Sequence, residues 1–413
     1  SGSVGIVCYR DQANNYRGEC KVLSMMGTSI QAGREHVFYT NTVAYVSVTA
    51  IGDRSAVVCY TYMYTSNPGH CRCKVLSASW EGAYGSWGVT SGTELAIQTS
   101  GTSYIRYIST SALDASSVLV CYEVDFSSSS SSDVGKCHVL SVSGTTLSEG
   151  VGATFSSALQ GNVVSVAALS SSNGVVCYET NQWYGGIEQS PYGACNLLYV
   201  SDTSLSVGAD LAFAVNMGSM SVASLDTGTL SGVLCYADQT DDTGPVCQHL
   251  MGPASAPVAP PPSPPPPAPP PVPTLTEGSA LSFRSTRTGA PSSVSLATLG
   301  PSSGVVCYVN PSQGSRGTCN TVGVSGTTLF KGSDLSFASS PYTVQQVSVA
   351  GLGNASAIVC YAWQYYHSDY RRYYDYANCF LASVSGTTLT AGAELRISSS
   401  RLDFLSVAVL DAS

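Results

Sequence analysis

Short apolar runs recur along the whole chain, and segments rich in glycine, serine, threonine or asparagine separate each run from the next. In one representative stretch the apolar runs cover residues 118–124, 137–142 and 163–169. Runs of this length, rich in valine and isoleucine and bounded by turn-forming residues, predict β-strands joined as hairpins. No segment shows the 3.6-residue period of an amphipathic helix. The pattern therefore predicts an all-β protein.

A tripeptide Val-Cys-Tyr or Leu-Cys-Tyr occurs seven times, and its cysteines stand 51 to 72 residues apart. Repeats of this size, each with four short strands, are typical of β-propeller blades. The chain begins in a Val-Cys-Tyr strand and ends in the strand that precedes it in the other repeats. We therefore predict one seven-bladed β-propeller over residues 1–413, with four-stranded antiparallel blades. The C-terminal strand should join the first blade and close the ring, which removes exposed sheet edges.

A second cysteine follows each tripeptide after 12 to 19 residues, which predicts one disulfide in every blade. Cys71 is left over, because Lys-Val-Leu-Ser follows Cys73 as it follows Cys20. Cys71 is then either a free or exchanging thiol or the site of a bridge between subunits. The expected pairs are Cys8–Cys20, Cys59–Cys73, Cys121–Cys137, Cys177–Cys195, Cys235–Cys247, Cys307–Cys319 and Cys360–Cys379.

Seven regular disulfides are typical of an oxidising compartment, so we expect an extracellular protein that is secreted, on a cell surface or in a fibre. Zinc sites commonly use cysteines spaced as Cys-x-x-Cys, and this spacing does not occur in the sequence. We therefore predict neither a metal nor a cofactor. Since a strand-like run already begins at residue 1, we expect a mature protein or a fragment of one.

Charged residues make up only 10% of the chain, and the net charge is −9. Binding to a phosphate backbone needs clustered cations, so a nucleic-acid partner is not expected. No apolar run approaches the roughly 20 residues of a membrane-spanning helix. We instead expect self-association or binding to other extracellular glycoproteins.

The sequence contains none of the common catalytic motifs, and we predict that the protein is not an enzyme. Four acidic residues follow the same strand of different repeats and could be considered as a carboxylate set. Since other repeats have glycine or serine there, we interpret the acids as turn residues that accept backbone hydrogen bonds. They are Asp53, Asp114, Asp226 and Asp411.

A proline-rich segment, 253–273, interrupts the fifth repeat where the other repeats have a short turn between the third and fourth strands. An insertion at a turn leaves the hydrogen-bonded ladder intact, although proline lacks the backbone N–H. Such a segment favours the extended polyproline II conformation. It is either a tolerated surface insertion or an arm that is glycosylated or docks on a partner.

The run SPPPPAPPP resembles the proline-rich regions of hydroxyproline-rich glycoproteins of algal and plant walls, including extensins and pherophorins. The disulfide-bridged repeats resemble those of algal cell-surface and mastigoneme fibre glycoproteins. The insert departs from the family pattern, because it is short and interrupts a domain. The resemblance implies covalent glycans on hydroxylated prolines, here Pro260, Pro261, Pro262, Pro264, Pro265, Pro266, Pro267, Pro269, Pro270 and Pro271.

Two further features agree with a glycosylated exterior. Asn354 begins an Asn-x-Ser sequence, which is an acceptor for N-glycosylation. Residues 127–132 are six consecutive serines between two paired cysteines, and we interpret them as a flexible polar loop in preference to an O-glycosylation site.

Aromatic residues gather between the paired cysteines of several repeats, hence on one face of the predicted ring. Tyrosine and tryptophan offer rigid amphipathic surface, which suits protein contacts and sugar stacking alike. The alternative is that they pack on one another around the disulfide. The predicted interface residues are Trp183, Tyr184, Trp363, Tyr365, Tyr366, Tyr370, Tyr373 and Tyr374.

These observations favour a non-enzymatic structural subunit of an extracellular glycosylated fibre or surface coat, which assembles through propeller loops and the proline-rich arm. The alternative is a lectin-like propeller that binds carbohydrate through its aromatic loops. A lectin of this kind would have similar pockets in many blades, whereas these loops differ from one another in length and content.

Overall fold

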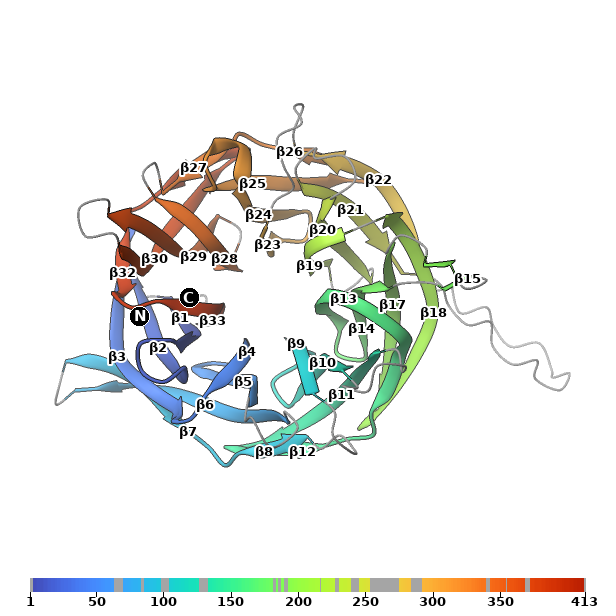
Figure 1. The fold of residues 1–413 in the computed structure, drawn as a ribbon, viewed down its shortest axis with the longest axis horizontal. Coiled ribbons are helices and arrows are strands. Elements are labelled where there is room, and N and C mark those ends of the chain that lie inside the picture. The colour runs from blue at the N-terminus through green and yellow to red at the C-terminus, as the bar shows by residue number, and fades with distance from the viewer. Residues whose placement is uncertain are drawn as a thin grey trace, which may run out of the picture.

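The computed structural model of the chain is a ring of antiparallel sheets around a central axis (Figure 1), which confirms the predicted seven-bladed propeller. Each blade is twisted and has its first strand nearest this axis, with four strands counted from the axis outward. The structure describes residues 3–411 except 63–69, 83–84, 98–103, 126–132, 181–182, 185–186, 189–191, 216, 227–229, 239–244, 253–274, 284–291, 339–341, 354 and 368–371.

The strands occupy equivalent positions in blades one to seven. The inner strands are β33 (Leu402–Asp411), β4 (Val43–Gly52), β9 (Tyr104–Ala112), β13 (Ala153–Ser170), β19 (Met217–Asp226), β23 (Val294–Gly300) and β28 (Thr343–Gly351). The second strands are β1 (Val4–Asp11), β5 (Ser55–Tyr62), β10 (Ser117–Asp125), β14 (Asn173–Thr180), β20 (Ser231–Asp238), β24 (Ser303–Asn310) and β29 (Ser356–His367). The third strands are β2 (Arg17–Met26), β6 (Cys71–Glu81), β11 (Asp133–Ser143), β17 (Tyr192–Ser201), β21 (Pro245–Met251), β25 (Arg316–Ser325) and β30 (Arg372–Ser385).

The outer strands are shorter or broken in several blades. They are β3 (Ser29–Tyr39), β7 (Ser86–Ser91) with β8 (Leu95–Ile97), β12 (Thr146–Glu149), β18 (Ser204–Val215), β22 (Thr276–Ser282), β26 (Thr328–Lys331) with β27 (Leu335–Phe337), and β31 (Thr388–Ala391) with β32 (Leu395–Ser398). The N-terminal part of β13 completes the outer edge of blade three before the strand continues into blade four. Outside the blades lie β15 (Trp183–Tyr184), β16 (Ile187–Glu188) and a short 3-10 helix, η1 (Pro311–Gln313).

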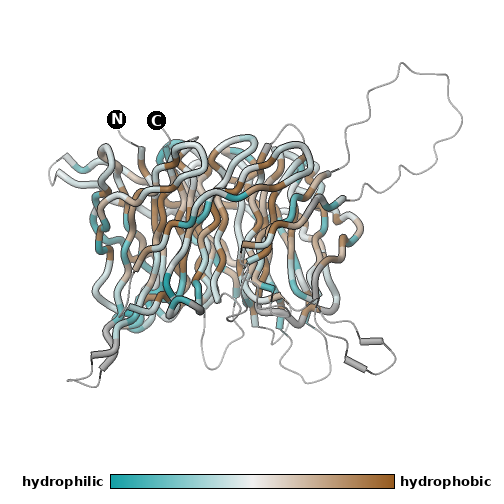
Figure 2. Tube along the Cα trace, turned by 90° about the horizontal axis from the view of Figure 1, so that it is seen from above, coloured by the Kyte–Doolittle hydropathy of each residue, from teal (hydrophilic) through white to brown (hydrophobic). Residues whose placement is uncertain are grey.

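The two ends of the chain share blade one. The C-terminal strand β33 pairs antiparallel with β1, and Val7 lies opposite Val407 in the register. Both termini therefore lie on the same face of the disc (Figure 2). This pairing confirms the predicted ring closure, in which the last strand supplies the inner strand of the first blade.

The second strands are buried on both faces, because each blade packs against a neighbour on either side. In β5, every residue from Ala56 to Tyr60 is fully buried. This double burial explains why the Val-Cys-Tyr runs are continuously apolar where a strand with one solvated face would alternate. Within the described residues the core is therefore a series of clusters between blades, each built from two neighbouring sheets.

A closed set of hydrogen bonds joins the inner strands of all seven blades. An inner strand is the edge of its sheet, so some of its N–H groups have no partner within the blade. In every blade one serine, which we call the ring serine, accepts such an N–H from the next blade at 3.0–3.1 Å. The bonds join Ser406 to Val48, Ser47 to Thr110, Ser109 to Val166, Ser165 to Val222, Ser221 to Leu296, Ser295 to Val349 and Ser348 to Val407.

Seven disulfides join the second and third strands, one in each blade, in the pairs that the sequence spacing predicts. The paired cysteines lie directly opposite in the strand register, with Cα atoms 4.1–4.2 Å apart. Each bridge closes the loop between two neighbouring strands. In the chain-entropy view, closing a loop of about 15 residues stabilises a fold by roughly 3 kcal/mol.

The turns between third and fourth strands explain where the proline-rich insert is attached. In four blades this turn has glycine at its first central position, at φ values of 58–63° that favour glycine: Gly27, Gly144, Gly326 and Gly386. In blade five, Met251 of β21 lies opposite Thr276 of β22, as Ser143 lies opposite Thr146 in blade three. The insertion therefore enters at the turn and leaves the strand register unchanged. Residues 253–274 themselves lie outside the described residues.

The free cysteine has a structural explanation. In four blades a glycine stands two residues before the second disulfide cysteine, and a phenylalanine of the outer strand covers it. A Cβ atom on Gly317, for example, would lie 2.0 Å from the ring of Phe337. In blade two this position is Cys71, which lies opposite Ile97 in β8 and is fully buried. Cys71 is thus a small core residue, and its thiol is not accessible for a bridge to another subunit.

Asp114, one of the acids interpreted as turn residues, accepts hydrogen bonds from the backbone N–H and hydroxyl of Ser116 at 2.7 and 2.8 Å. Burial alone would raise the pKa of Asp114. The backbone and side-chain hydrogen bonds that its carboxylate accepts outweigh burial and lower this pKa below its ordinary value. Among the described residues, no helix is long and apolar enough to cross a membrane.

We predict that Ser165→Ala destabilises the ring. The variant leaves the N–H of Val222 buried and without an acceptor, at an expected cost of about 1–3 kcal/mol. The midpoint of chemical denaturation measures this change, and Ser165→Thr, which keeps a hydroxyl, is the control. An unchanged midpoint for Ser165→Ala would show that the ring bonds do not stabilise the fold.

We predict that substitution by alanine destabilises the protein less at Cys71 than at Gly317, although the two residues occupy equivalent positions of the repeat. Cys71→Ala should cost only about 1 kcal/mol, because it removes one buried atom and no disulfide. Gly317→Ala should cost about 1–3 kcal/mol, because the added methyl group meets the ring of Phe337. Thermal melting of both variants, with a free-thiol assay on the unfolded proteins, checks the prediction. Equal losses of stability would contradict the predicted difference, and with it the role of the Phe337 ring in excluding a side chain at Gly317.

Candidate functional site

A cavity of about 930 Å³ lies at one opening of the central channel. The residue two positions before each ring serine lines it, so every blade contributes one side chain at this level. In order around the ring, these residues are Phe404, Tyr45, Tyr107, Val163, Ser219, Ser293 and Gln346. The repeat thus fixes where the side chains stand, while their chemistry varies from blade to blade.

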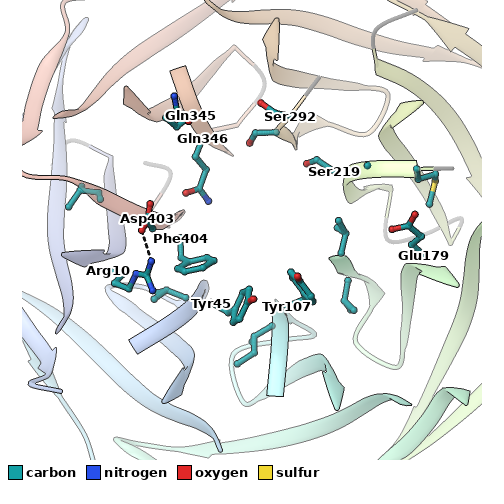
Figure 3. A pocket seen from close by; sticks show the side chains of 18 residues that line it. Arg10, Tyr45, Tyr107, Glu179, Ser219, Ser292, Gln345, Gln346, Asp403 and Phe404 are labelled. Atoms are coloured by element: carbon teal, nitrogen blue, oxygen red, sulfur yellow. Dashed lines mark hydrogen bonds and ion pairs between the residues drawn. The ribbon is translucent and has the colours of Figure 1, made fainter. Parts of the chain in front are cut away.

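Three neighbouring blades supply aromatic rings, which we call the aromatic wall: Phe404, Tyr45 and Tyr107. The ring centroids of Tyr45 and Phe404 are 4.6 Å apart, and those of Tyr45 and Tyr107 are 4.8 Å apart. All three residues are half-buried, so each presents part of its ring to the channel. Figure 3 shows the rings side by side along one edge of the opening.

The backbone of the aromatic wall is left-handed. The φ angles of Tyr45, Tyr107 and Phe404 are 48°, 49° and 52°, a conformation that bulky residues rarely adopt. Each residue sits at an irregularity in the pairing of its inner strand. Such conformations cost about 1–3 kcal/mol each, and bulges commonly re-aim side chains at functional sites. The same strained geometry, repeated three times on one wall, supports a functional role for the rings.

Three other consecutive blades, five to seven, supply polar side chains, which we call the polar wall: Ser219, Ser293 and Gln346. Figure 3 shows Ser219 on the far side of the opening from Phe404, and Gln346 next to Phe404. Each side-chain oxygen accepts an N–H from the following blade, at 2.8, 3.2 and 3.0 Å respectively. These bonds hold the groups in place. A serine hydroxyl that accepts one bond still has its own hydrogen to donate. The Gln346 amide donates one N–H to the carbonyl oxygen of Leu405 at 3.4 Å and has a second N–H. The polar wall can therefore both donate to and accept from a bound molecule.

Charge in the cavity is largely compensated. Arg10 forms an ion pair with Asp403 at 2.5 Å, and its guanidinium lies 4.7 Å from the ring centroid of Phe404. Gln12 also donates to Asp403. Glu179, which is 7% exposed, lies on the other side of the opening from Asp403 (Figure 3). The site therefore has polar groups but little uncompensated charge.

Tyr107 of the aromatic wall is a neutral hydrogen-bonding group. Burial, the proximity of Tyr45 and the hydrogen bond with it raise the pKa of Tyr107 above its ordinary value. Within the described part of the chain, no group of three or more histidine, cysteine or acidic side chains is placed to hold a metal ion. Apolar ring faces together with hydroxyl and amide groups are suited to a neutral, polyhydroxylated molecule.

The ends of the second strands, where the predicted aromatic loops begin, lie on the same face as this opening, since inner strands begin where second strands end. Of the predicted interface residues, Trp363 is only 7% exposed and packs between Tyr342 and Tyr376, with ring centroids 4.3 and 4.5 Å away. The self-packing alternative thus describes Trp363 better than an exposed contact does.

The other predicted interface residues are placed less fully. In the hairpin of β29 and β30, Tyr365 lies opposite Tyr374 and Tyr366 lies opposite Tyr373. Trp183 and Tyr184 form β15, which pairs with β16. Tyr370, Asn354 and the ten prolines lie outside the described residues. Their roles remain predictions.

The sequence prediction missed the aromatic wall, although the sequence contains a signal for it. When the repeats are aligned on the ring serine, the position two residues earlier is aromatic in three blades that are adjacent in the closed ring, and polar in three others. The left-handed backbone that turns the rings into the channel has no such signal.

No known protein family matches the sequence, and no curated protein matches it. Among solved structures, a hypothetical selenium-binding protein from Sulfolobus tokodaii has a TM-score of 0.57 at 8% identity, covering 98% of this chain and 93% of that one. The SapL1 lectin in complex with α-methyl fucoside has a TM-score of 0.41 at 11% identity, covering 87% and 97%. The chain is thus similar to known proteins in its propeller fold alone.

Proposed function

We propose that the protein is an extracellular, non-enzymatic propeller that binds neutral carbohydrate in the opening of its central channel. The proposal rests on one observation: the aromatic wall and the polar wall line the same cavity. The two faces of a sugar ring differ in the same way, since C–H groups make them apolar while hydroxyl groups project around the edge. Stacking on the aromatic wall and hydrogen bonding to the polar wall would use both properties.

The size of the cavity agrees with this proposal. Pockets for small molecules commonly measure about 300–1,000 Å³, and they combine apolar walls with a few fixed polar groups. The opening falls in this range at about 930 Å³. Because neighbouring backbone groups already hold the polar wall, little ordering of side chains is needed on binding.

The contacts of Asp403, a carboxylate in the lining of the cavity, favour binding without catalysis. Hydrolysis of a glycosidic bond usually needs two carboxyl groups, one of which donates or accepts a proton. Asp403 is held as an ion pair by Arg10 and accepts a further hydrogen bond from Gln12. These contacts already engage Oδ2 of Asp403 and favour a structural role for this carboxylate.

The extracellular location is supported by the seven disulfides, which persist in oxidising compartments. They also restrain both strands that flank each loop on the channel-opening face. A preformed site that disulfides hold rigid is suited to an extracellular environment, where chaperones and thiol-reducing enzymes are scarce.

A second candidate function is a subunit of a glycosylated fibre or surface coat. It is favoured by the place where the proline-rich insert is attached, between Met251 and Thr276 at a third-to-fourth-strand turn. These turns lie on the face opposite the channel opening. An arm on one face and a binding opening on the other would make the two faces of the disc different, as head-to-tail assembly requires. The two candidate functions are compatible, because glycans on such an arm could be ligands of a neighbouring copy.

We predict that Tyr45→Gly combined with Tyr107→Gly weakens carbohydrate binding at least tenfold. Glycine relieves the left-handed backbone strain at both positions, so the fold should be retained while the rings are lost. A glycan array would identify neutral ligands, and isothermal titration would measure Kd. Tyr104→Ala, at an exposed tyrosine on the same strand as Tyr107, is the control. Unchanged binding by the double variant would reject the channel as the site.

We predict hydroxyproline with attached pentose or hexose chains within 253–273 of the native protein. Mass spectrometry of the proteolytic peptide that spans this segment is the measurement. Unmodified prolines would remove the glycosylated-arm hypothesis, and with it the support for the fibre candidate.

A further inference from the structure

Two blades differ from the rest at the turn between the third and fourth strands. In blades one, three, four, six and seven, two residues separate the paired residues that flank this turn, as they separate Ser143 and Thr146 in blade three. In blade five the proline-rich segment enters here. In blade two the strands continue past this point, and Trp80 lies opposite Trp87 in the added length. The face of these turns therefore has one aromatic and one proline-rich departure from the repeat.

The two tryptophans of blade two, which we call the tryptophan pair, form an exposed aromatic surface. Trp80 is 55% exposed, and its ring meets that of Trp87 edge to face, with the centroids 5.9 Å apart. Trp87 is half-buried and packs against the core between blades one and two. A Cβ atom on Gly33 of β3 would lie 2.5 Å from the carbonyl oxygen of Trp87, so the two outer strands are in close contact. Trp87 is thus anchored in the fold, while Trp80 presents more than half of its surface to solvent.

The surroundings of the tryptophan pair suit an extended, proline-rich chain. Arg54, in the turn between β4 and β5, has its guanidinium carbon 5.4 Å from the ring centroid of Trp87. A guanidinium group has five N–H donors. The carbonyl groups of a polyproline II helix have no partner within the helix, and proteins that bind such helices contact the proline rings with aromatic side chains. The tryptophan pair and Arg54 together supply rings for the prolines and donors for the carbonyl groups.

The chain itself contains a segment with this chemistry. Residues 260–271 are all proline except Ser263 and Ala268, and residues 253–273 include no charged side chain. A partner can therefore bind the segment through its rings and carbonyl groups, and not through ion pairs. The attachment point of the segment at β22 and the strand β7 lie on opposite sides of the ring (Figure 1). Within one copy the disc separates the segment from the tryptophan pair, whereas a second copy beside blade five can bring its own pair next to the segment.

We propose that the tryptophan pair is a docking site for the proline-rich segment 253–273 of a second copy of the chain. Each copy then has a segment on one side and a docking site on the opposite side. Because the two surfaces differ, the contact is heterologous and can repeat into an open chain of copies. Docking of this kind engages only a few prolines, so glycans on the others are compatible with it. The inference goes beyond carbohydrate binding in the channel opening and does not depend on it.

Two complementary variants of the full chain, produced in a host that does not modify proline, test the proposal by sedimentation velocity. In the linker variant a glycine–serine sequence of equal length replaces residues 253–273, and in Trp80→Ala the docking site loses its exposed ring. We expect the unaltered chain to associate as its concentration rises, and each variant alone to associate at least tenfold more weakly, because tryptophans at the centre of an interface commonly dominate its affinity. An equimolar mixture of the two variants should form a 1:1 dimer and nothing larger, since each pair then has one intact segment and one intact docking site.

The control variant is Tyr104→Ala, which removes an exposed ring from the channel-opening face and should associate as the unaltered chain does. A synthetic peptide of residues 253–273 should inhibit association, whereas a glycine–serine peptide of the same length should not. The proposal is overturned if the unaltered chain stays monomeric, which includes docking within one copy, or if association persists in both variants. A mixture that associates no better than either variant alone would overturn it as well. None of these results bears on sugar binding in the channel, so the two proposals stand or fall separately.

Discussion

The hydrogen bond from a strand N–H to a serine of the neighbouring blade is the interaction on which the ring depends. An inner strand is a sheet edge, and its N–H groups face the next blade. Seven serines in equivalent positions accept one such group each, and the last bond, from Val407 to Ser348, returns to the first blade. Because the cycle is complete, the blades are held in one register relative to one another around the channel. The residue two positions before each serine therefore reaches the same level of the channel.

This arrangement separates the parts of the repeat that maintain the fold from the parts that can vary. The Val-Cys-Tyr strands, the disulfides and the glycine–phenylalanine contacts stabilise each blade and its seams. The channel position contributes less to packing, so it is aromatic in some blades and polar in others. The same stability allows three strained backbone conformations in the aromatic wall, at about 1–3 kcal/mol each. The polar wall is ordered by the hydrogen bonds that also connect the blades.

Much of the fold could be predicted from the sequence, because repeats reveal blades and cysteine spacing reveals pairs. The closing strand also followed from the phase of the repeat at the two ends. Cys71 was harder to interpret, since an odd cysteine suggests reactivity when considered alone. Its place in the blade shows that it substitutes for glycine beside an isoleucine where other blades have phenylalanine. The comparison of repeats at this position, and not the count of cysteines, explains the residue.

The candidate site was only partly predictable, for physical reasons. Aromatic residues in loops attract attention by their number, yet the burial of Trp363 depends on how a long hairpin packs against its neighbours. The rings of Tyr45, Tyr107 and Phe404 enter the channel because their backbone is left-handed, which residue type does not indicate. Their alignment two positions before the ring serines is visible in the sequence. It gains meaning only when the ring closes and brings blades one, two and three together.

The most direct test of the proposed function is a crystal structure of the protein with a neutral oligosaccharide that binds in solution. We expect a sugar ring to lie with its apolar face on the aromatic wall and its hydroxyl groups directed toward the polar wall. Sugar bound only at the outer loops, with none in the channel opening, would contradict the proposal.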